Sequence, residues 1–241
     1  MRAGCSASVS FAGNPPNSEP AMCPAKTAYS LLVFDWDGTL MDSTAVITRS
    51  IQAACRDLGL AVPSDVDASY VIGLGLGDAL RFAAPMLDPG DYDLLSQAYR
   101  RHYFAHDSDL TLFPGALDML QALKSAGHSI AVATGKSRQG LDRALDHAGL
   151  RHLFDATRTA DESASKPHPA MLEQIMETLG HGPEQTLMIG DTTHDLLMAR
   201  NAGAAAAAVS YGAHDARELA ALQPVYVADS VASLKRFLLG E

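Results

Sequence analysis

Short apolar runs separated by amphipathic stretches make up most of the chain after residue 30. The first run, Leu31–Phe34, ends directly in acidic residues, and similar runs lie at 129–133, 186–189 and 204–209, with a weaker one at 225–227. Apolar runs of this length are typical of strands that are buried on both faces of a parallel sheet. The pattern therefore predicts a parallel sheet whose strands alternate with helices.

Two stretches between these runs have the spacing of amphipathic helices. Apolar residues recur at i, i+3, i+4 and i+7 from Leu141 and again from Leu172. Gly149 and Gly180 follow the two patterns, at the position where a glycine commonly ends a helix. Helices between parallel strands cover both faces of the sheet, so the predicted fold class is a doubly wound, Rossmann-like α/β core.

Residues 44–112 break this alternation, because no run in the segment favours a strand. One helical face is formed by apolar residues at helical spacing, namely Ile47, Ile51, Ala54, Cys55 and Leu58. A second helix is expected from Asp78, and Asp88 followed by Pro89 suits the start of a third. The segment is therefore predicted to be an all-helical insertion.

The chain is thus expected to have three parts. Residues 29–43 and 113–241 would form the α/β core, and residues 44–112 a helical cap. Residues 1–28 are rich in Ser, Gly, Pro and Ala and show no periodic apolar face, which predicts a disordered N-terminal tail. The tail lacks the apolar run of a secretory signal, and Met22 is a second candidate start of translation.

Composition excludes several classes of protein. No run of about 18 apolar residues is present, so no membrane association is expected. The formal net charge is -10 and the basic residues are scattered, which argues against a nucleic-acid partner. The three cysteines, Cys5, Cys23 and Cys55, lie far apart, as in proteins of the reducing cytoplasm. The sequence carries no signal of an oligomeric state.

Two aspartates follow the first apolar run. Asp35 and Asp37 stand at i and i+2 after the strand, where open α/β sheets bind their ligands, and Gly38 permits a tight turn. Two carboxylates this close repel each other unless a cation lies between them or one is protonated. The pair suits a nucleophile with an acid–base partner, although an Asp-Gly turn after a strand is also common.

A second acidic pair follows another apolar run. Asp191 comes directly after the run at 186–189, and Asp195 lies about one helical turn later, so both can face one point. Carboxylates from a second strand end could complete an oxygen ligand set for Mg²⁺. Aspartate at a helix start is also a routine capping residue, so this pair is weaker on its own.

Two further segments suit a phosphate. Thr134 and Gly135 follow the run at 129–133, where a hydroxyl and free amides near a helix N-terminus can bind an anion. Lys166 precedes Pro167, which restricts its backbone to extended geometry and could hold its ammonium toward a phosphate. In isolation, a helix cap and a surface lysine are at least as common.

The combination is more specific than its parts. Asp-x-Asp-Gly-Thr from Asp35, then Thr134, then Lys166-Pro, then Gly-Asp191-x-x-x-Asp195 occur in this order along the chain. This order resembles the haloacid dehalogenase (HAD) superfamily, and within it the phosphoglycolate phosphatase-like group, which has a helical cap after the first motif. The resemblance covers residues 31 to about 235 and implies a HAD core with an inserted cap.

The resemblance also implies roles for single residues. Asp35 would be the nucleophile that forms an aspartyl-phosphate, and Asp37 the general acid and base. Thr134, Gly135 and Lys166 would bind the phosphoryl group of the substrate and offset its charge in the transition state.

A Mg²⁺ cofactor follows from the same resemblance. Asp35, the backbone carbonyl of Asp37, and Asp191 would bind the ion, with Asp195 nearby. The implied activity is that of a Mg²⁺-dependent phosphoric monoester hydrolase, which acts in the cytoplasm on a small phosphorylated metabolite such as phosphoglycolate.

Other activities occur on the same fold. A dehalogenase lacks the second aspartate, whereas Asp37 is present, and a phosphonatase needs a cap lysine, which residues 44–112 lack. A phosphomutase or a pyrophosphatase shares the motifs, so both stay alternatives. The intact motifs disfavour a non-catalytic binding protein.

The cap contains one further candidate. Gly73, Gly75 and Gly77 form a loop whose spacing does not fit a dinucleotide fingerprint and which resembles the cap loop of phosphoglycolate phosphatase-like enzymes. Arg81 is the first basic residue after this loop, and its guanidinium would suit a substrate carboxylate. A solvated helix residue and a flexible linker are the alternatives.

Overall fold

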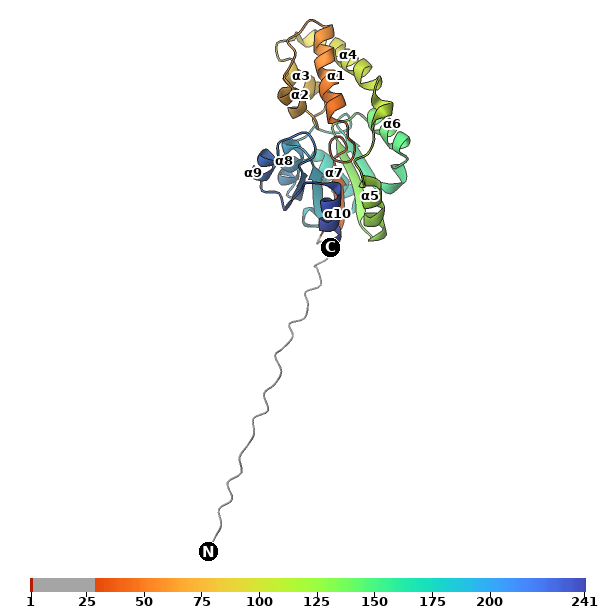
Figure 1. Cartoon of the computed structure of the whole chain (residues 1–241), viewed down its shortest axis with the longest axis vertical. Coiled ribbons are helices and arrows are strands. Elements are labelled where there is room, and N and C mark those ends of the chain that lie inside the picture. The colour runs from red at the N-terminus through yellow and green to blue at the C-terminus, as the bar shows by residue number, and fades with distance from the viewer. Residues whose placement is uncertain (2–28) are drawn as a thin grey trace.

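The computed structural model describes Met1 and residues 29–241 (Figure 1). The predicted disordered tail, apart from Met1, and the candidate start Met22 therefore lie outside the described residues. Among the described residues, no helix is long and apolar enough to cross a membrane.

Six parallel strands form one sheet in the order β3-β2-β1-β4-β5-β6. Their bounds are β1 (Leu31–Phe34), β2 (Ser129–Thr134), β3 (Ala156–Thr159), β4 (Thr186–Gly190), β5 (Ala205–Val209) and β6 (Tyr226–Ala228). The five predicted strands are confirmed to within a residue or two at each end. Strand β3 was not predicted, because its sequence Ala-Thr-Arg-Thr carries no apolar run. It lies at the sheet edge and pairs only with β2.

Helices cover both faces of this sheet, which confirms the doubly wound class. The helices of the core are α5 (Ala116–Ser125), α6 (Arg138–Ala148), α7 (Ala170–Leu179), α8 (Thr193–Asn201), α9 (Ala216–Ala221) and α10 (Val231–Leu239). Alternate residues of β1 point to opposite faces, so that Leu32 packs with α5, α6 and α10, and Leu31 with α7 and α8. Gly149 and Gly180 end α6 and α7 with positive φ, as predicted.

Four further helices stand together above the sheet (Figure 1). They are α1 (Thr44–Asp57), α2 (Asp65–Tyr70), α3 (Leu76–Ala83) and α4 (Tyr92–Phe104), and their apolar faces form a separate hydrophobic cluster. One predicted helix start was wrong, since helix α3 begins at Leu76, after an extended Gly75, rather than at Asp78. The other is found: Asp88 is the N-cap and Pro89 the first residue of a short 3-10 helix that leads into α4, although Asp88 makes no side-chain capping bond.

The chain enters and leaves this helical segment at neighbouring points. The N–H of Asp42 donates to the carbonyl of Thr111 at 3.0 Å, and the N–H of Phe113 donates to the carbonyl of Leu40 at 3.0 Å. Met41 and Leu112 form an antiparallel bridge between the two crossings. The helices α1 to α4 are therefore joined to the core by two adjacent chain segments that are hydrogen-bonded to each other.

Candidate active site

Three buried carboxylates meet at the carboxyl edge of the sheet. Asp35 follows β1, Asp191 follows the neighbouring strand β4, and Asp195 lies in the first turn of α8. Each is at most 1% exposed, and one ligand atom from each lies within 4.8 Å of the others. The expected meeting of these three groups is thus found, since the ends of adjacent parallel strands share one edge.

Lys166 lies among these carboxylates. Its Nζ is 2.7 Å from Oδ1 of Asp35 and 2.6 Å from Oδ1 of Asp195, and its side chain is fully buried. Oδ2 of Asp35 is also buried, but has no hydrogen-bond partner among the described residues. One ammonium thus lies among three buried carboxyl groups, and one oxygen of Asp35 has no hydrogen-bond partner among the described residues.

Burial changes the titration of the acidic groups. It raises the pKa of Asp35 well above the ordinary value, even though Lys166 lowers it. Burial, and then the neighbouring Asp195, raise the pKa of Asp191 to about 7. Burial disfavours a charged carboxylate, and a nearby like charge disfavours it further. A bound cation would offset both effects.

The loop after β1 fits closely against Asp191. Gly38 has a φ of +78°, and a Cβ there would collide with the Asp191 carboxylate, so the position requires glycine. The Thr39 hydroxyl donates to Oδ1 of Asp191 at 2.9 Å, and the N–H of Ala213 donates to Oδ2 at 2.7 Å. Both oxygens of Asp191 are therefore oriented by hydrogen bonds.

Asp195 has a structural task beside its place in the cluster. Its Oδ2 accepts from the hydroxyl of Thr192 at 2.6 Å and from the Thr192 N–H at 3.1 Å. This capping box fixes the start of α8 and turns Oδ1 toward Lys166.

Asp37 lies at the outer side of the carboxylate cluster and is held through one oxygen. Its Oδ1 accepts from the Ser43 hydroxyl at 2.6 Å and lies 3.1 Å from Nζ of Lys136. Nζ of Lys136 also donates to the hydroxyl oxygen of Tyr103, on α4, at 2.8 Å. Although burial lowers the pKa of Lys136, the Asp37 carboxylate raises it above its ordinary value, so the group is a cation.

The segment after β2 contacts both the acidic site and the helical segment. Thr134 is 1% exposed, and its hydroxyl accepts from the N–H of Lys136 at 3.2 Å. A Cβ on Gly135 would collide with the backbone carbonyls of Gly73 and Leu74, so the glycine loop between α2 and α3 lies directly on this segment. Thr134 does not cap α6, since Ser137 does.

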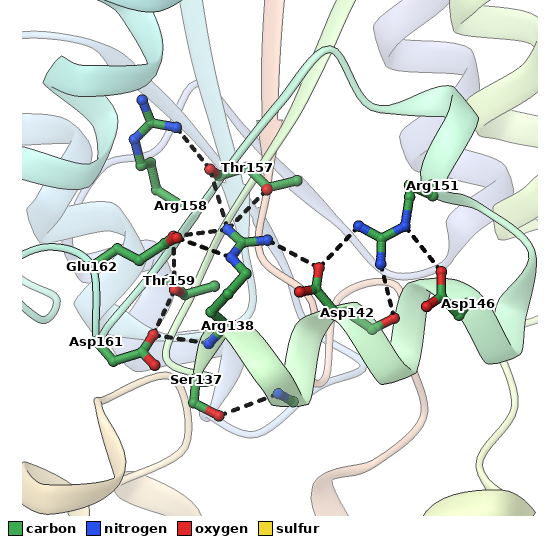
Figure 2. Close-up of polar contacts among 11 residues, drawn as sticks. Ser137, Arg138, Asp142, Asp146, Arg151, Thr157, Arg158, Thr159, Asp161 and Glu162 are labelled. Carbon is green, nitrogen blue, oxygen red and sulfur yellow. Dashed lines mark hydrogen bonds and ion pairs between the residues drawn. The ribbon is translucent and has the colours of Figure 1, made fainter.

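A polar network ties this segment to the loop that precedes Lys166 (Figure 2). The N–H of Arg138 donates to Asp161 at 2.8 Å, and the Arg138 guanidinium donates to Glu162 at 2.8 and 3.0 Å. The hydroxyl of Thr159 donates to both acids. The network fixes the two loops against each other beside the site.

A cavity of about 560 Å³ lies between helices α1 to α4 and the core. Among the residues that line it are Asp37, Gly73, Gly75, Arg81, Tyr103 and Lys136. Asp35 is not among the lining residues and is 1% exposed.

Arg81 stands apart from the other predicted site residues. Its side chain is 65% exposed and pairs with Asp78 at 3.1 Å, as on an ordinary helix surface, although it also lines the cavity. Among the predicted residues, the structure thus gives Arg81 a largely exposed place on the cavity wall, apart from the buried acidic cluster.

Several residues of the site were missed by sequence reasoning. Thr39, Ser43 and Lys136 hold the aspartates, and the positions of Thr39 and Lys136 inside the motifs are the signal that could have identified them. His194 and His214 were also missed. Each places Nε2 within 3.0 Å of the carbonyl of Tyr70 at the end of α2, which joins core to cap.

A profile of the family described as haloacid dehalogenase-like hydrolase matches residues 32–209. A protein named "Probable phosphatase IndB" from Dickeya dadantii (strain 3937) is 36% identical over 207 residues, which cover 83% of this chain and 89% of that protein. A phosphoglycolate phosphatase from Aliivibrio fischeri (strain ATCC 700601 / ES114) is 32% identical, covering 83% and 92% of the two chains. A pyrophosphatase, PpaX, from Oceanobacillus iheyensis is 28% identical, covering 83% and 92%.

Solved structures agree with this result. A haloacid dehalogenase-like family hydrolase from Streptococcus pneumoniae superposes with a TM-score of 0.76 at 27% identity, covering 88% of this chain and 99% of that one. The fold and the acidic site thus define a hydrolase of the phosphatase type. The chain belongs to the haloacid dehalogenase-like hydrolase family.

Proposed function

We propose that this enzyme is a Mg²⁺-dependent phosphatase of a small phosphorylated metabolite and works through an aspartyl-phosphate on Asp35. The observation that carries the proposal is the environment of Asp35. One of its oxygens is paired with Lys166, and the other is buried and has no hydrogen-bond partner among the described residues. A buried carboxylate left in this state suits a nucleophile whose free oxygen meets a cation or a phosphoryl group.

The reaction would take place in two steps. A carboxylate oxygen of Asp35 forms a bond to phosphorus as the bond to the leaving oxygen breaks, and protonated Asp37 gives its proton to that oxygen. Asp37, now a carboxylate, then takes a proton from water as the water oxygen bonds to phosphorus. The bond to Asp35 breaks and phosphate is released.

The residues around the nucleophile would stabilise the transferring group. Thr134, Gly135 and Lys166 would hold the phosphoryl oxygens and offset their charge. Asp37 and Gly135 line the cavity, where the leaving group of a substrate would lie.

The acidic cluster fits a hard cation. Oxygen donors from Asp35, Asp191 and the Asp37 backbone would bind Mg²⁺, with Asp195 at the edge of the site. The unpartnered Oδ2 of Asp35 and the raised pKa of Asp191 support this assignment. When bound, the ion would neutralise charge on the phosphoryl oxygens.

A cavity of about 560 Å³ suits a small substrate. Phosphoglycolate is our first candidate, since a relative that is 32% identical is named for this activity, and Arg81 would receive the carboxylate. Inorganic pyrophosphate is the second candidate, since another relative is named a pyrophosphatase. We further propose that residues 44–112 act as the cap over this site, and that the enzyme works in the cytoplasm, where the buried thiol of Cys55 would stay reduced.

The test combines a substrate panel with two variants. Hydrolysis of p-nitrophenyl phosphate should stop in EDTA and return with Mg²⁺. Asp35→Asn should abolish turnover, and Asp37→Asn should reduce it by roughly 10²–10⁴-fold. Near-normal turnover of Asp35→Asn would overturn the covalent mechanism. The panel should include phosphoglycolate, pyrophosphate and sugar phosphates, and the highest kcat/KM identifies the substrate class.

A further inference from the structure

Lys136 makes two contacts that the proposed mechanism does not use. Its Nζ lies 3.1 Å from Oδ1 of Asp37 in the core and 2.8 Å from the hydroxyl oxygen of Tyr103 in the cap. The side chain is only 10% exposed. A buried ammonium is therefore shared between the acid–base residue and a residue of the cap.

The contact fixes which oxygen of Asp37 is available for chemistry. Ser43 and Lys136 both meet Oδ1, and no hydrogen bond reaches Oδ2 from any residue between 29 and 241. Because Asp37 lines the cavity, Oδ2 is the oxygen that can carry the proton to and from a substrate. One hydrogen bond from Ser43 and one ion pair with Lys136 on the same oxygen hold the carboxyl group and leave Oδ2 available.

Tyr103 makes this arrangement depend on the position of the cap. It lies near the end of α4, and its ring also stands over the Lys136 ammonium, 4.7 Å from ring centre to Nζ. If the cap moves away, Lys136 loses both the hydroxyl oxygen and the ring face. The ammonium then has only Asp37 to bind, and water replaces Tyr103.

We propose that Lys136 is a positioning residue that, together with Tyr103 of the cap, holds Asp37 ready for proton transfer only while the cap is closed. The inference rests on the proposed function, in which Asp37 is the general acid and base.

Leaving groups of different quality test the assignment. Phenyl phosphate and p-nitrophenyl phosphate have nearly the same shape, but phenoxide is a poorer leaving group and needs more help from an acid. Lys136→Met should lower kcat/KM by roughly 10–100-fold for phenyl phosphate and much less for p-nitrophenyl phosphate. Lys136→Arg, which keeps a cation, should recover part of the loss. Equal losses with both substrates would overturn the proposal, because they would show that Lys136 acts by binding the phosphate or by stabilising the fold.

A double-mutant cycle tests whether Lys136 acts through Asp37. In the Asp37→Asn background, Lys136→Met should have less than about a twofold effect with phenyl phosphate. If the loss of kcat/KM in the double variant equals the product of the two single losses, Lys136 acts independently of Asp37, for instance on an anionic part of the substrate. That result would overturn the inference.

Tyr103→Phe isolates the part played by the cap. It removes the hydroxyl and keeps the ring, so we expect a selective loss for phenyl phosphate of about 3–10-fold, smaller than for Lys136→Met. Tyr92→Phe is the matched control, because Tyr92 is on the same helix, donates its hydroxyl to the carbonyl of Ala84 and does not line the cavity; the change keeps the ring that faces Arg81. If Tyr103→Phe and Tyr92→Phe have the same kcat/KM for phenyl phosphate, Lys136 does not depend on the cap in the way we propose.

The two proposals can fail separately. If Asp35→Asn stays active, the proposed function fails whatever the Lys136 variants do. If Asp35→Asn and Asp37→Asn are inactive and Lys136→Met behaves like the surface control Lys235→Met, only this inference fails.

Discussion

The hydroxyl of Thr39 donates a 2.9 Å hydrogen bond to Oδ1 of Asp191 and so joins the loop after β1 to the end of β4. Partners of this kind orient a metal ligand, and their loss typically costs 10–100-fold in metal affinity. Thr39→Val should therefore raise the Mg²⁺ concentration needed for half-maximal activity by roughly that factor. Thr39→Ser keeps the hydroxyl and should stay near the wild type. If Thr39→Val needs no more Mg²⁺ than the wild type, the hydrogen bond from Thr39 to Asp191 does not contribute to metal binding.

The raised pKa of Asp191 predicts how Mg²⁺ stabilisation depends on pH. The ordinary pKa of an aspartate is near 4, and that of folded Asp191 is about 7. Between these values the folded protein keeps a proton that the unfolded chain releases, so the stability of the metal-free protein falls as pH rises from about 4 to about 7. Mg²⁺ competes with this proton, and its increase in Tm should be larger at about pH 8 than at about pH 5.5.

Thermal unfolding with and without Mg²⁺ at the two pH values measures this difference. Asp191→Asn is the control and should lose most of the Mg²⁺ effect at both. An equal rise in Tm at both pH values for the wild type would mean that Mg²⁺ binds elsewhere.

Removal of the buried ammonium should destabilise the fold. Lys166→Met leaves Asp35 and Asp195 buried without their cation, and the loss of one partner of such a pair costs about 3–5 kcal/mol. Urea unfolding at neutral pH measures the loss. Lys235→Met breaks an exposed pair with Asp118 and should cost less than about 1 kcal/mol. Equal stability of the two variants would contradict an ionic role for Lys166.

Gly135→Ala should separate activity from stability. The added methyl group meets the backbone carbonyls of Gly73 and Leu74, so the cap loop must shift away from the site. Misplacement by about 1 Å can cost roughly 100-fold in rate, and we expect a loss of that order in kcat/KM with the core still folded. Gly90→Ala, where nothing lies within 4 Å, is the control and should leave kcat/KM unchanged. Normal activity of Gly135→Ala would show that this contact does not form during turnover.

Arg81 gives a test of substrate recognition. If its guanidinium leaves Asp78 and meets a carboxylate, Arg81→Ala should raise KM for phosphoglycolate strongly. The same variant should leave p-nitrophenyl phosphate nearly unaffected, since that substrate has no carboxylate. Equal changes in KM for the two substrates, or no change for either, would show that Arg81 does not bind the substrate carboxylate and is an ordinary surface residue.

The sheet could be predicted from the sequence wherever strands are buried on both faces. The strands β1, β2 and β4 have continuous apolar runs for this reason. Strand β3 has a neighbour on one side only, and Arg158 and Thr157 are partly exposed there, so no local pattern marked it. An edge strand is defined by its partner rather than by its own residues.

The site could be predicted in part for a related reason. Parallel strands end at one edge, and so the aspartates that follow β1 and β4 had to meet. The contact of Lys136 with Tyr103 and that of His194 with Tyr70 depend on how α1 to α4 sit on the core. These contacts join segments that are far apart in the sequence. The periodicity of apolar residues within one segment does not indicate how that segment packs against another.

The adjacent crossings at Asp42 and Thr111 have a consequence for the history of the enzyme. The two ends of the helical segment lie side by side and are hydrogen-bonded to each other. The short junction with the core can therefore keep the same geometry whatever segment is inserted between the two ends. A segment of another length or shape can be exchanged there without changing the register of β1 or the start of α5. If this segment covers the active site as we propose, selection can exchange it, and with it the choice of substrate, while the core that carries the hydrolytic chemistry is inherited unchanged.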